Sequence, residues 1–522
     1  MKVMRMNWIT LGLLTGTLMA SGEALACEPL PITGKKQGHF DASGKLCFTL
    51  PVVAENYVTA ELSGAIDAGL RRGEQPYREL LRHGPSEGNH QLLFALPQQQ
   101  TTTLRLSGKP NQPWSLSWHI RAATPLERRQ TPAPVSPTLQ RLSARLAAGE
   151  SSEAFWRSIA TRGTPLIEPY DARHKRVTFL WRGDQRNVYL FGSPAGDQVP
   201  LFRLADSDVW FRSFVVPADT LMQYRFSPDV PAIPDSPLAQ HRAILVNAQA
   251  DPLNPRSGKP GSHDRWNHAS LLDLTRQRDC TAAAMAHPLT AGALTRSRFY
   301  SDRLDNERDI QIYRPHRAAA WTLMLFDGNV YQQEQRIVNV LDALIARGEL
   351  PPVNLVLIDS LDLARRAQEL TPNPVFADVM AQELRPWLSA RGLPLHASHT
   401  ILSGSSYGGL AAAWVALRYP QLFGNVLSLS GSYWWAPKGE PASWLTREYQ
   451  RAPRKPIRFW LQAGTFEIDG PDNGIYLNNL EFEQVLRSKG YPVSFHPTAS
   501  GHDYSGWCEA LVTGLQHFSA PR

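Results

Sequence analysis

A Gly-x-Ser-x-Gly pentapeptide at residues 404–408 constrains the fold of this chain more than any other feature. It follows an apolar segment at residues 400–402 and precedes a helix-forming segment at residues 410–417. A strand, a tight glycine turn and a helix in that order expose a serine Oγ above a parallel sheet. The glycines suit a turn with no room for neighbouring Cβ atoms. Ser406 is therefore the candidate nucleophile, and the flanking segments carry this prediction because the bare pentapeptide also occurs in ordinary turns.

The sequence around the pentapeptide alternates between apolar segments and helical patterns. Predicted strands cover residues 310–313, 322–326, 353–358, 400–402 and 425–429, and predicted helices cover residues 335–347 and 376–389. Strands that alternate with helices are typical of an open, mostly parallel sheet. We therefore expect an α/β fold for residues 291–522 and place the catalytic module there.

Upstream of residue 291 the pattern changes to short alternating strands in two blocks. The first block predicts a small, jelly-roll-like β-sandwich over residues 27–121, and the second predicts a β-sandwich domain over residues 151–290. Residues 122–150 contain a proline-rich stretch and a short helical pattern, which predict a stiff linker followed by a helix. With 522 residues the chain is long enough for this three-domain organisation.

The first 26 residues have the pattern of an export signal. Lys2 and Arg5 precede an apolar stretch, and Ala24-Leu25-Ala26 supplies the small residues that a signal peptidase needs. No later segment approaches the roughly 18 uninterrupted apolar residues of a membrane helix. We expect cleavage after Ala26 and a mature, exported protein without a transmembrane segment.

Four cysteines remain in the mature chain, an even number that suits an oxidising compartment. Pairing neighbours predicts the disulfides Cys27–Cys47 and Cys280–Cys508. A lipoprotein acylated at Cys27 is the competing interpretation. It is disfavoured because Ala24 stands where lipoprotein signals usually carry leucine and because acylation would leave Cys47 without a partner. No cysteine spacing resembles a zinc site, and we predict no metal site.

The net charge of +7 is a modest basic excess that favours anionic ligands or surfaces in general. The basic residues are scattered along the chain rather than clustered. Together with the export signal, this distribution argues against nucleic acid as a partner.

A serine nucleophile needs a histidine base and an acid that orients it, here expected in the order acid, then histidine, after Ser406. His502 lies in a polar glycine loop near the C-terminus and is preferred over His496, which falls within a predicted strand. Glu467, in the loop after the predicted strand at residues 459–464, is the preferred acid, and Asp469 is the alternative. A Ser-His dyad without a close acid stays open.

Charge that develops on a substrate carbonyl oxygen requires backbone N–H donors. One is expected from Tyr407, directly after the nucleophile. The other is expected from the loop at residues 326–329 after an earlier strand, with Asn329 as the donor.

At these residues the C-terminal two-thirds of the chain resembles the enterochelin (enterobactin) esterases of the Fes type, within the esterase D-like α/β-hydrolases. The specific motifs are Leu-Phe-Asp-Gly at residues 325–328, Arg-Ala-Gln-Glu-Leu at residues 366–370 and Ser-Gly-Ser-Tyr-Trp-Trp at residues 430–435. The resemblance implies hydrolysis of the trilactone ester bonds of catecholate siderophores. It implies no cofactor, because iron arrives as part of the substrate, and it assigns residues 151–290 to the N-terminal β-domain of this family.

A ferric tris-catecholate is a trianion with flat aromatic rings, so its pocket should combine arginines and aromatic side chains. The candidates are Arg366, Trp434 and Trp435, with Arg182 and Arg212 as contributions from the β-domain. Arg366 is also explained by a structural ion pair, and the two tryptophans by core packing.

The export signal and the extra N-terminal sandwich depart from the usual Fes pattern. The signal predicts that this form acts in the periplasm. Two other functions stay open on the sequence. One is a general secreted carboxylesterase that acts on acyl sugars or aryl esters, and the other is a non-catalytic siderophore-binding protein on a hydrolase scaffold.

Overall fold

The computed structural model describes residues 27–520 except 52–55, 74, 82–88, 97–100, 123–130, 197, 234–236, 257, 260–264, 276–279, 281–282, 284–287 and 470–473. The predicted export signal, residues 1–26, lies outside the described residues, as does part of the predicted linker. The chain divides into two compact units, Met1–Ala122 and Ala123–Arg522. We call residues 27–122 the N-terminal module, residues 151–290 the β-domain and residues 291–520 the C-terminal domain.

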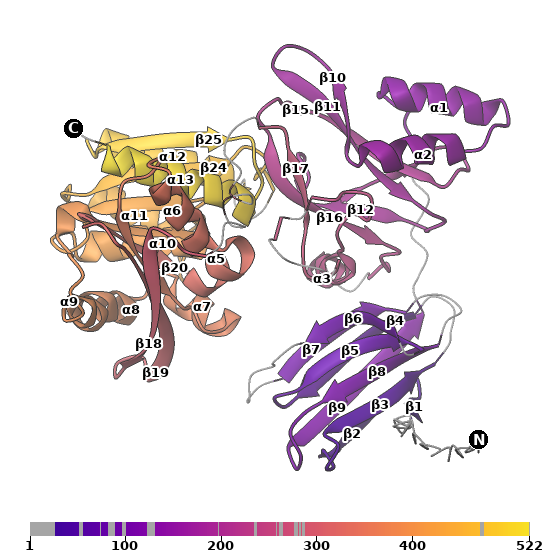
Figure 1. Cartoon of the computed structure of the whole chain (residues 1–522), viewed down its shortest axis with the longest axis horizontal. Helices are drawn as coiled ribbons and strands as arrows, with labels where there is room; N and C mark the ends of the chain where they lie inside the picture. Colours follow the sequence, from indigo (N-terminus) through magenta and orange to yellow (C-terminus); the bar gives the residue numbers. More distant parts are fainter. Residues whose placement is uncertain are drawn as a thin grey trace, which may run out of the picture. The chain divides into compact units, whose positions relative to one another are not determined.

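The N-terminal module contains two sheets around one apolar core (Figure 1). One sheet has the order β1-β3-β8-β5-β6 and the other β2-β9-β4-β7. Alternate residues of the strands, such as Leu104 and Leu106 of β8, point into this core. The strands are β1 (Glu28–Pro29), β2 (Thr33–His39), β3 (Lys45–Leu50), β4 (Asn56–Ser63), β5 (Asp67–Arg72), β6 (Gln75–Leu81), β7 (Asn89–Ala95), β8 (Thr102–Ser107) and β9 (Pro113–Ala122).

The β-domain has two four-stranded sheets, β10-β11-β15-β14 and β13-β12-β16-β17, preceded by two helices. Val177, Phe179 and Trp181 alternate along β11 and pack against Tyr224 and Phe226 of β16, so aromatic side chains fill the core between the sheets. Helix α1 (Pro137–Ala147) precedes the domain. The elements of the domain are α2 (Glu153–Arg162), β10 (Leu166–Pro169), β11 (His174–Arg182), β12 (Val188–Phe191), β13 (Val199–Pro200), β14 (Phe202–Arg203), β15 (Val209–Pro217), β16 (Leu221–Pro228), α3 (Pro237–Asn247) and β17 (Ser270–Asp273).

The C-terminal domain is built on an eight-stranded sheet with the order β18-β19-β21-β20-β22-β23-β24-β25. The first two strands run antiparallel to their neighbours, and the other six are parallel to one another. The strands are β18 (Gly292–Ser301), β19 (Asn306–Pro315), β20 (Trp321–Phe326), β21 (Val353–Ile358), β22 (Thr400–Ser405), β23 (Asn425–Leu429), β24 (Arg458–Gly464) and β25 (Val493–Thr498).

Helices cover both faces of this sheet (Figure 1). Met324 and Phe326 of β20 face a core shared with α8, α10, α11 and α12, whereas Leu323 and Leu325 face the core of α5, α6 and α13. The helical segments are α5 (Gly328–Gln335), α6 (Ile337–Ala346), α7 (Leu363–Glu369), α8 (Pro374–Val379), the π-helix η1 (Met380–Leu384), α9 (Arg385–Ser389), the 3-10 helix η2 (Ala397–His399), α10 (Tyr407–Arg418), α11 (Trp444–Arg451), α12 (Gly474–Ser488) and α13 (Tyr504–Ser519).

The mixed α/β fold predicted for the C-terminal domain is confirmed, and each of its predicted strands falls within an observed one. Strand β18 was not predicted. Its residues 294–298 are mostly exposed, so they lack the apolar pattern of the buried strands. The predicted helix at residues 335–347 is interrupted at Arg336, which adopts a positive φ of 48° between α5 and α6.

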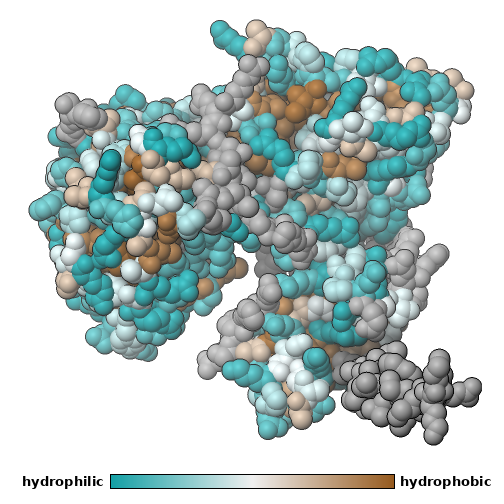
Figure 2. Space-filling view, viewed as in Figure 1, coloured by the Kyte–Doolittle hydropathy of each residue, from teal (hydrophilic) through white to brown (hydrophobic). Residues whose placement is uncertain are grey.

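Both predicted disulfides are present. Cys27–Cys47 lies within the N-terminal module, and Cys280–Cys508 ties the end of the β-domain to α13 of the C-terminal domain. Among the described residues no helix is long and apolar enough to cross a membrane. The face drawn in Figure 2 is largely hydrophilic, with hydrophobic side chains in separate groups.

Candidate active site

Ser406 stands at the turn between β22 and α10, in a backbone conformation that non-glycine residues rarely adopt. Its φ is 58° and its ψ is −120°. Such a conformation costs about 1–3 kcal/mol and persists only where surrounding contacts enforce it. Here the Ser406 N–H donates to the Leu429 carbonyl at 3.0 Å, and the Ser406 carbonyl accepts from the Ser432 N–H at 3.0 Å. Neighbouring strand β23 and the segment after it therefore hold the turn in place.

Gly404 is required by the sharpness of this turn. A Cβ at residue 404 would lie 2.8 Å from the backbone of Gly408, closer than real Cβ atoms approach. The glycine thus lets the first turn of α10 fold back over the end of β22, which leaves the Ser406 side chain half-buried at the sheet edge. Its Oγ lies 3.1 Å from the Ser432 Oγ.

His502 and Glu467 form the best-defined polar pair at the same edge of the sheet. The His502 Nδ1 and the Glu467 Oε2 are 2.6 Å apart. Glu467 is only 5% exposed and follows β24, and His502 lies in the loop between β25 and α13. A buried carboxylate next to Nδ1 holds the imidazole in the tautomer whose other nitrogen can accept a proton.

The second oxygen of Glu467 is held by a small hydrogen-bond network. Oε1 accepts from the Gly464 N–H at 2.7 Å and from the Ser430 Oγ at 2.5 Å. The Trp507 Nε1 donates to the same Ser430 Oγ at 2.9 Å, and the Trp507 ring stands edge-on to the imidazole of His502 with 4.6 Å between centroids. The carboxylate is therefore fully engaged, and its orientation toward His502 is fixed.

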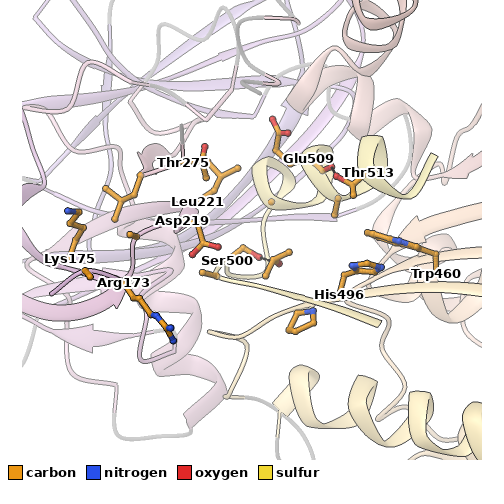
Figure 3. Close-up of a pocket in the computed structure, with 18 residues that line it drawn as sticks. Arg173, Lys175, Asp219, Leu221, Thr275, Trp460, His496, Ser500, Glu509 and Thr513 are labelled. Carbon is orange, nitrogen blue, oxygen red and sulfur yellow. Dashed lines mark hydrogen bonds between the residues drawn. The ribbon is translucent and has the colours of Figure 1, made fainter. Parts of the chain in front are cut away.

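The two alternative residues, Asp469 and His496, make other contacts. The Asp469 carboxylate lies against Gly196 of the β-domain, where a Cβ would come within 1.6 Å of it. His496 stacks on the indole of Trp460 at 4.7 Å between centroids. His496 also lines a cavity of about 850 Å³. Trp460 and His496 lie at one end of this cavity, and Arg173 and Lys175 lie at the other (Figure 3). Neither side chain takes part in the Glu467–His502 pair.

Tyr407 and Asn329 both occupy the first turn of a helix at the carboxyl edge of the sheet. Strands β20 and β22 are parallel neighbours, with Leu325 opposite Ser403, so the helices that follow them begin side by side. The first N–H groups of a helix have no intrahelical acceptor. The backbone N–H groups of Tyr407 and Asn329 thus lie at the starts of neighbouring helices, where backbone donors can stabilise an oxyanion.

Arg366 is bound to the buried carboxylate of Asp327, directly before α5. Its Nε donates to Oδ1 at 2.8 Å and its terminal nitrogen to Oδ2 at 2.7 Å. Burial alone would lower the pKa of Arg366, but the hydrogen bonds and the charge of Asp327 raise it. The guanidinium also lies 5.5 Å from the centroid of the Tyr407 ring. Through these two contacts Arg366 links Asp327, the residue before α5, to the start of α10.

The predicted aromatic pair lies nearby, half-buried. The ring centroid of Trp434 is 6.1 Å from that of Tyr407, whereas Trp435 packs edge-on against Trp444 at 6.4 Å. Trp434 is therefore next to the nucleophile turn, and Trp435 belongs mainly to the packing under it.

A cavity of about 530 Å³ opens beside His502, between the β-domain and the C-terminal domain. Neither Arg182 nor Arg212 lines it. Arg182 pairs with Glu153 and Asp208 within the β-domain, and Arg212 lies over the rings of Phe202 and Phe214. Both belong to the sheet of β11 and β15, whereas the other sheet of the domain faces this cavity.

Among the described residues that line this cavity is a cation, Arg225 of β16, which the sequence analysis did not select. Burial lowers the pKa of Arg225, and the charge of Glu334 opposes that shift. An arginine keeps its charge even when buried. The aromatic lining residues are Phe191, Tyr224, Phe466 and Tyr504. The alternation of apolar and polar residues at 221–228 predicts a half-buried strand. It does not predict which side chains face the cavity, because that depends on how the two domains dock.

Ser430 and Ser432 were also missed as site residues, although a signal was available. They directly follow β23, the parallel neighbour of β22, and polar residues after such a strand lie at the same edge as the nucleophile. Among the described residues no group of three or more histidine, cysteine or carboxylate side chains is placed to hold a metal ion.

Two family models match the chain. The model Esterase matches residues 301–518, and the model "Enterochelin esterase, N-terminal" matches residues 176–279. The first covers the domain that carries Ser406 and the Glu467–His502 pair. The chain is therefore an ester hydrolase with a mixed α/β esterase domain.

Relatives narrow this class. The iron(III) enterobactin esterase of Dickeya dadantii is 31% identical over 412 residues, which are 71% of this chain and 93% of the relative. That of Escherichia coli K12 is 29% identical and covers 70% of this chain and 95% of its own length. The enterobactin esterase FES from Shigella flexneri, solved in the presence of enterobactin, superposes with a TM-score of 0.57 at 29% identity and covers 70% and 98% of the two chains. The chain belongs to the iron(III) enterobactin esterase family, which confirms the resemblance.

Proposed function

We propose that this chain hydrolyses the trilactone ester bonds of catecholate siderophores, with ferric enterobactin and its relatives as substrates. The observation that carries the proposal is the Glu467–His502 pair at the same sheet edge as Ser406, in a chain that matches enterobactin esterases over nearly their whole length. The names of these relatives state the substrate class.

In the proposed mechanism Ser406 Oγ attacks the lactone carbonyl while His502 Nε2 accepts its proton. Glu467 holds the Nδ1–H of the imidazole and stabilises the positive charge that forms on it. The N–H groups of Tyr407 and Asn329 stabilise the oxyanion. Collapse of the tetrahedral intermediate breaks the ester C–O bond, and His502 returns the proton to the departing alcohol. A water molecule then hydrolyses the acyl-Ser406 ester by the same steps in reverse.

We assign Arg366 to this mechanism through its ion pair with Asp327. The pair fixes the residue before α5, and thereby the Asn329 N–H, next to the turn of Ser406. Because Asp327 is fully buried, loss of the guanidinium would leave an uncompensated charge there. Arg366 is thus proposed as a positioning residue rather than the main contact of a trianionic substrate.

For substrate recognition we propose Arg225 in place of Arg182 and Arg212, together with aromatic side chains near the nucleophile. A ferric tris-catecholate carries three negative charges on flat rings, which suits a buried guanidinium beside aromatic surfaces. Arg225 lines the cavity next to His502, and Trp434 lies against Tyr407. Trp435 is assigned to packing.

We further propose that the protein is exported and acts in the periplasm, with both β-rich regions folded as sandwich domains. The predicted signal at residues 1–26 and two disulfides among the described residues support export, because disulfides persist in oxidising compartments.

The test incubates the purified mature protein and its Ser406→Ala variant with ferric and iron-free enterobactin and follows linear trimer, dimer and monomer by mass spectrometry. We expect cleavage by the wild type and at least about a thousandfold less by the variant. Intact enterobactin alongside rapid hydrolysis of short-chain aryl esters would contradict the proposed substrate and favour a general carboxylesterase. Binding of enterobactin without any ester hydrolysis would favour a non-catalytic carrier.

A further inference from the structure

Strand β16 of the β-domain runs directly against the loop that carries His502. The Leu221 N–H donates to the Ala499 carbonyl at 3.0 Å, and the Gln223 N–H donates to the Asp503 Oδ2 at 3.1 Å. The two contacts, at residues 499 and 503, thus lie on either side of the histidine in the chain. A β-domain strand therefore forms one wall of the loop that holds the proposed base.

The side chain of Gln223 extends this contact. Its Nε2 donates to the Ser505 Oγ at 2.8 Å and to the Gly258 carbonyl at 3.2 Å. Ser505 lies in the first turn of α13, so the amide reaches past His502 to the helix that follows it. The fit is close, because a Cβ at residue 258 would lie 2.6 Å from the amide carbon of Gln223.

The Gly258 carbonyl also connects Gln223 to the other half of the site. It accepts from the Nε2 of Gln335, a fully buried residue at the end of α5. The adjacent Lys259 pairs with Glu334 of α5 at 2.8 Å. Helix α5 carries Asn329 in its first turn. One β-domain glutamine is thus hydrogen-bonded to the histidine loop and, through a single carbonyl, to the oxyanion helix.

Asp503 receives these contacts next to His502. Its Oδ1 accepts from the N–H groups of Ser505 and Gly506 at 3.0 and 3.1 Å, which caps α13, while its Oδ2 accepts from Gln223. Burial raises the pKa of Asp503 to about 6, and the three N–H groups oppose this shift. The residue beside the histidine is therefore held by α13 on one side and by β16 on the other.

We propose that Gln223 is a positioning residue that holds the His502 loop and the Asn329 helix in their catalytic arrangement. The inference rests on the proposed function, in which Ser406, His502 and Asn329 carry the reaction. A catalytic group must stay within roughly 0.5 Å of its productive position, and its supporting hydrogen bonds provide that precision. In this chain the support for two separate catalytic elements comes from another domain.

The test compares Gln223→Met with Gln240→Met in the full mature protein. Methionine keeps the length of the side chain and removes its hydrogen bonds. Gln240 is a matched control because it also makes two hydrogen bonds, to the Ile233 N–H and the Pro231 carbonyl, both within the β-domain. The substrate is a short nitrophenyl ester, and the second readout is the rate at which a fluorophosphonate labels Ser406 in the folded protein.

For Gln223→Met we expect kcat to fall about tenfold with KM within twofold, and labelling to slow by a similar factor. Gln240→Met should change kcat, KM and the labelling rate each by less than twofold. Equal values for the two variants would overturn the inference, whatever their melting temperatures. If Gln223→Met does not fold, Ser505→Ala removes one of its two side-chain hydrogen bonds and must still lower kcat with KM within twofold; an unchanged kcat would overturn the inference.

Ser406→Ala separates this inference from the proposed mechanism. If Ser406→Ala still hydrolyses the ester, the proposed nucleophile is wrong. If Ser406→Ala is inactive and Gln223→Met matches its control, the positioning role alone is wrong.

Discussion

The N-terminal module and the β-domain are both built from two sheets around an apolar core, but they differ in their relation to the rest of the chain. The N-terminal module forms a compact unit of its own, and its disulfide closes within it. The β-domain shares a unit with the C-terminal domain and is joined to it by Cys280–Cys508 and by the hydrogen bonds of Gln223.

The difference teaches that β-structure alone does not tell which region belongs to an active site. The two regions use the same alternation of inward and outward residues to build a core. What distinguishes the β-domain is a strand, β16, whose N–H groups and Gln223 side chain bind the loop of His502, the proposed base, and the start of α13. The following predictions test this distinction from the largest expected effect to the smallest.

The largest effect is expected from removing the two disulfides in turn. Cys280–Cys508 spans 228 residues, and a chain-entropy argument gives it about 5 kcal/mol of stability, against about 3 kcal/mol for Cys27–Cys47, which spans 20. Calorimetry of the two double-serine variants should show a lowered transition for the unit of residues 123–522 in the first and for the N-terminal module in the second. One shared transition that shifts in both variants would contradict the separation of the units.

The next effect concerns the two carboxylates of the acid loop. Glu467→Gln should lower kcat about a thousandfold, because an amide facing Nδ1 favours the wrong imidazole tautomer. Asp469→Asn should change kcat for a small ester less than threefold, since Asp469 lies against Gly196 rather than His502. Steady-state kinetics of the two variants distinguish them, and a larger loss for Asp469→Asn would assign the acid to the β-domain interface.

A smaller effect, on substrate binding, is expected from replacing Arg225 in the cavity beside His502. Arg225→Met should raise KM for ferric enterobactin about tenfold, because one buried charge contact with an anion contributes roughly 1.5–3 kcal/mol. Glu334 keeps its partner Lys259 in this variant. KM for a small neutral ester should stay within twofold. Arg182→Met is the control, since Arg182 is paired within the β-domain. A KM effect at Arg182 instead would return the substrate contact to the sheet of β11 and β15.

In the C-terminal domain the sequence was sufficient to predict which loops and turns follow the parallel strands and therefore lie at one edge of the sheet. Residues after the carboxyl ends of such strands meet at one edge, so the order of Ser406, Glu467 and His502 along the chain predicts their common location. The structure adds the 2.6 Å contact between Glu467 and His502, which no sequence pattern contains. Of these two carboxylates, Glu467 and Asp469, which are two positions apart, Glu467 is the one that contacts His502.

The β-domain contacts could not be predicted because they depend on how two domains dock. Gln223 and Arg225 lie on one strand with ordinary alternation, and Arg182 and Arg212 have the same pattern on the other sheet. Which of the two sheets faces the cavity beside His502 is decided by contacts between residues far apart in the chain, such as Gln223 and Asp503, which are 280 positions apart. The substrate implied by the family resemblance favours arginines in general but does not select the one beside His502.

The smallest effect is expected from deleting the N-terminal module. A chain that begins at residue 123 after a new export signal retains the whole unit of residues 123–522, including every residue assigned here to catalysis and the Cys280–Cys508 disulfide. The module's apolar core is formed by its own strands. We therefore expect kcat and KM for a short ester to stay within twofold and the melting transition of the larger unit to be unchanged. A loss of activity comparable to that of Gln223→Met would mean that both β-rich regions serve the active site, and the comparison between them would fail. If kcat and KM for the short ester are unchanged while KM for ferric enterobactin is raised, the module contributes only to binding of the large substrate.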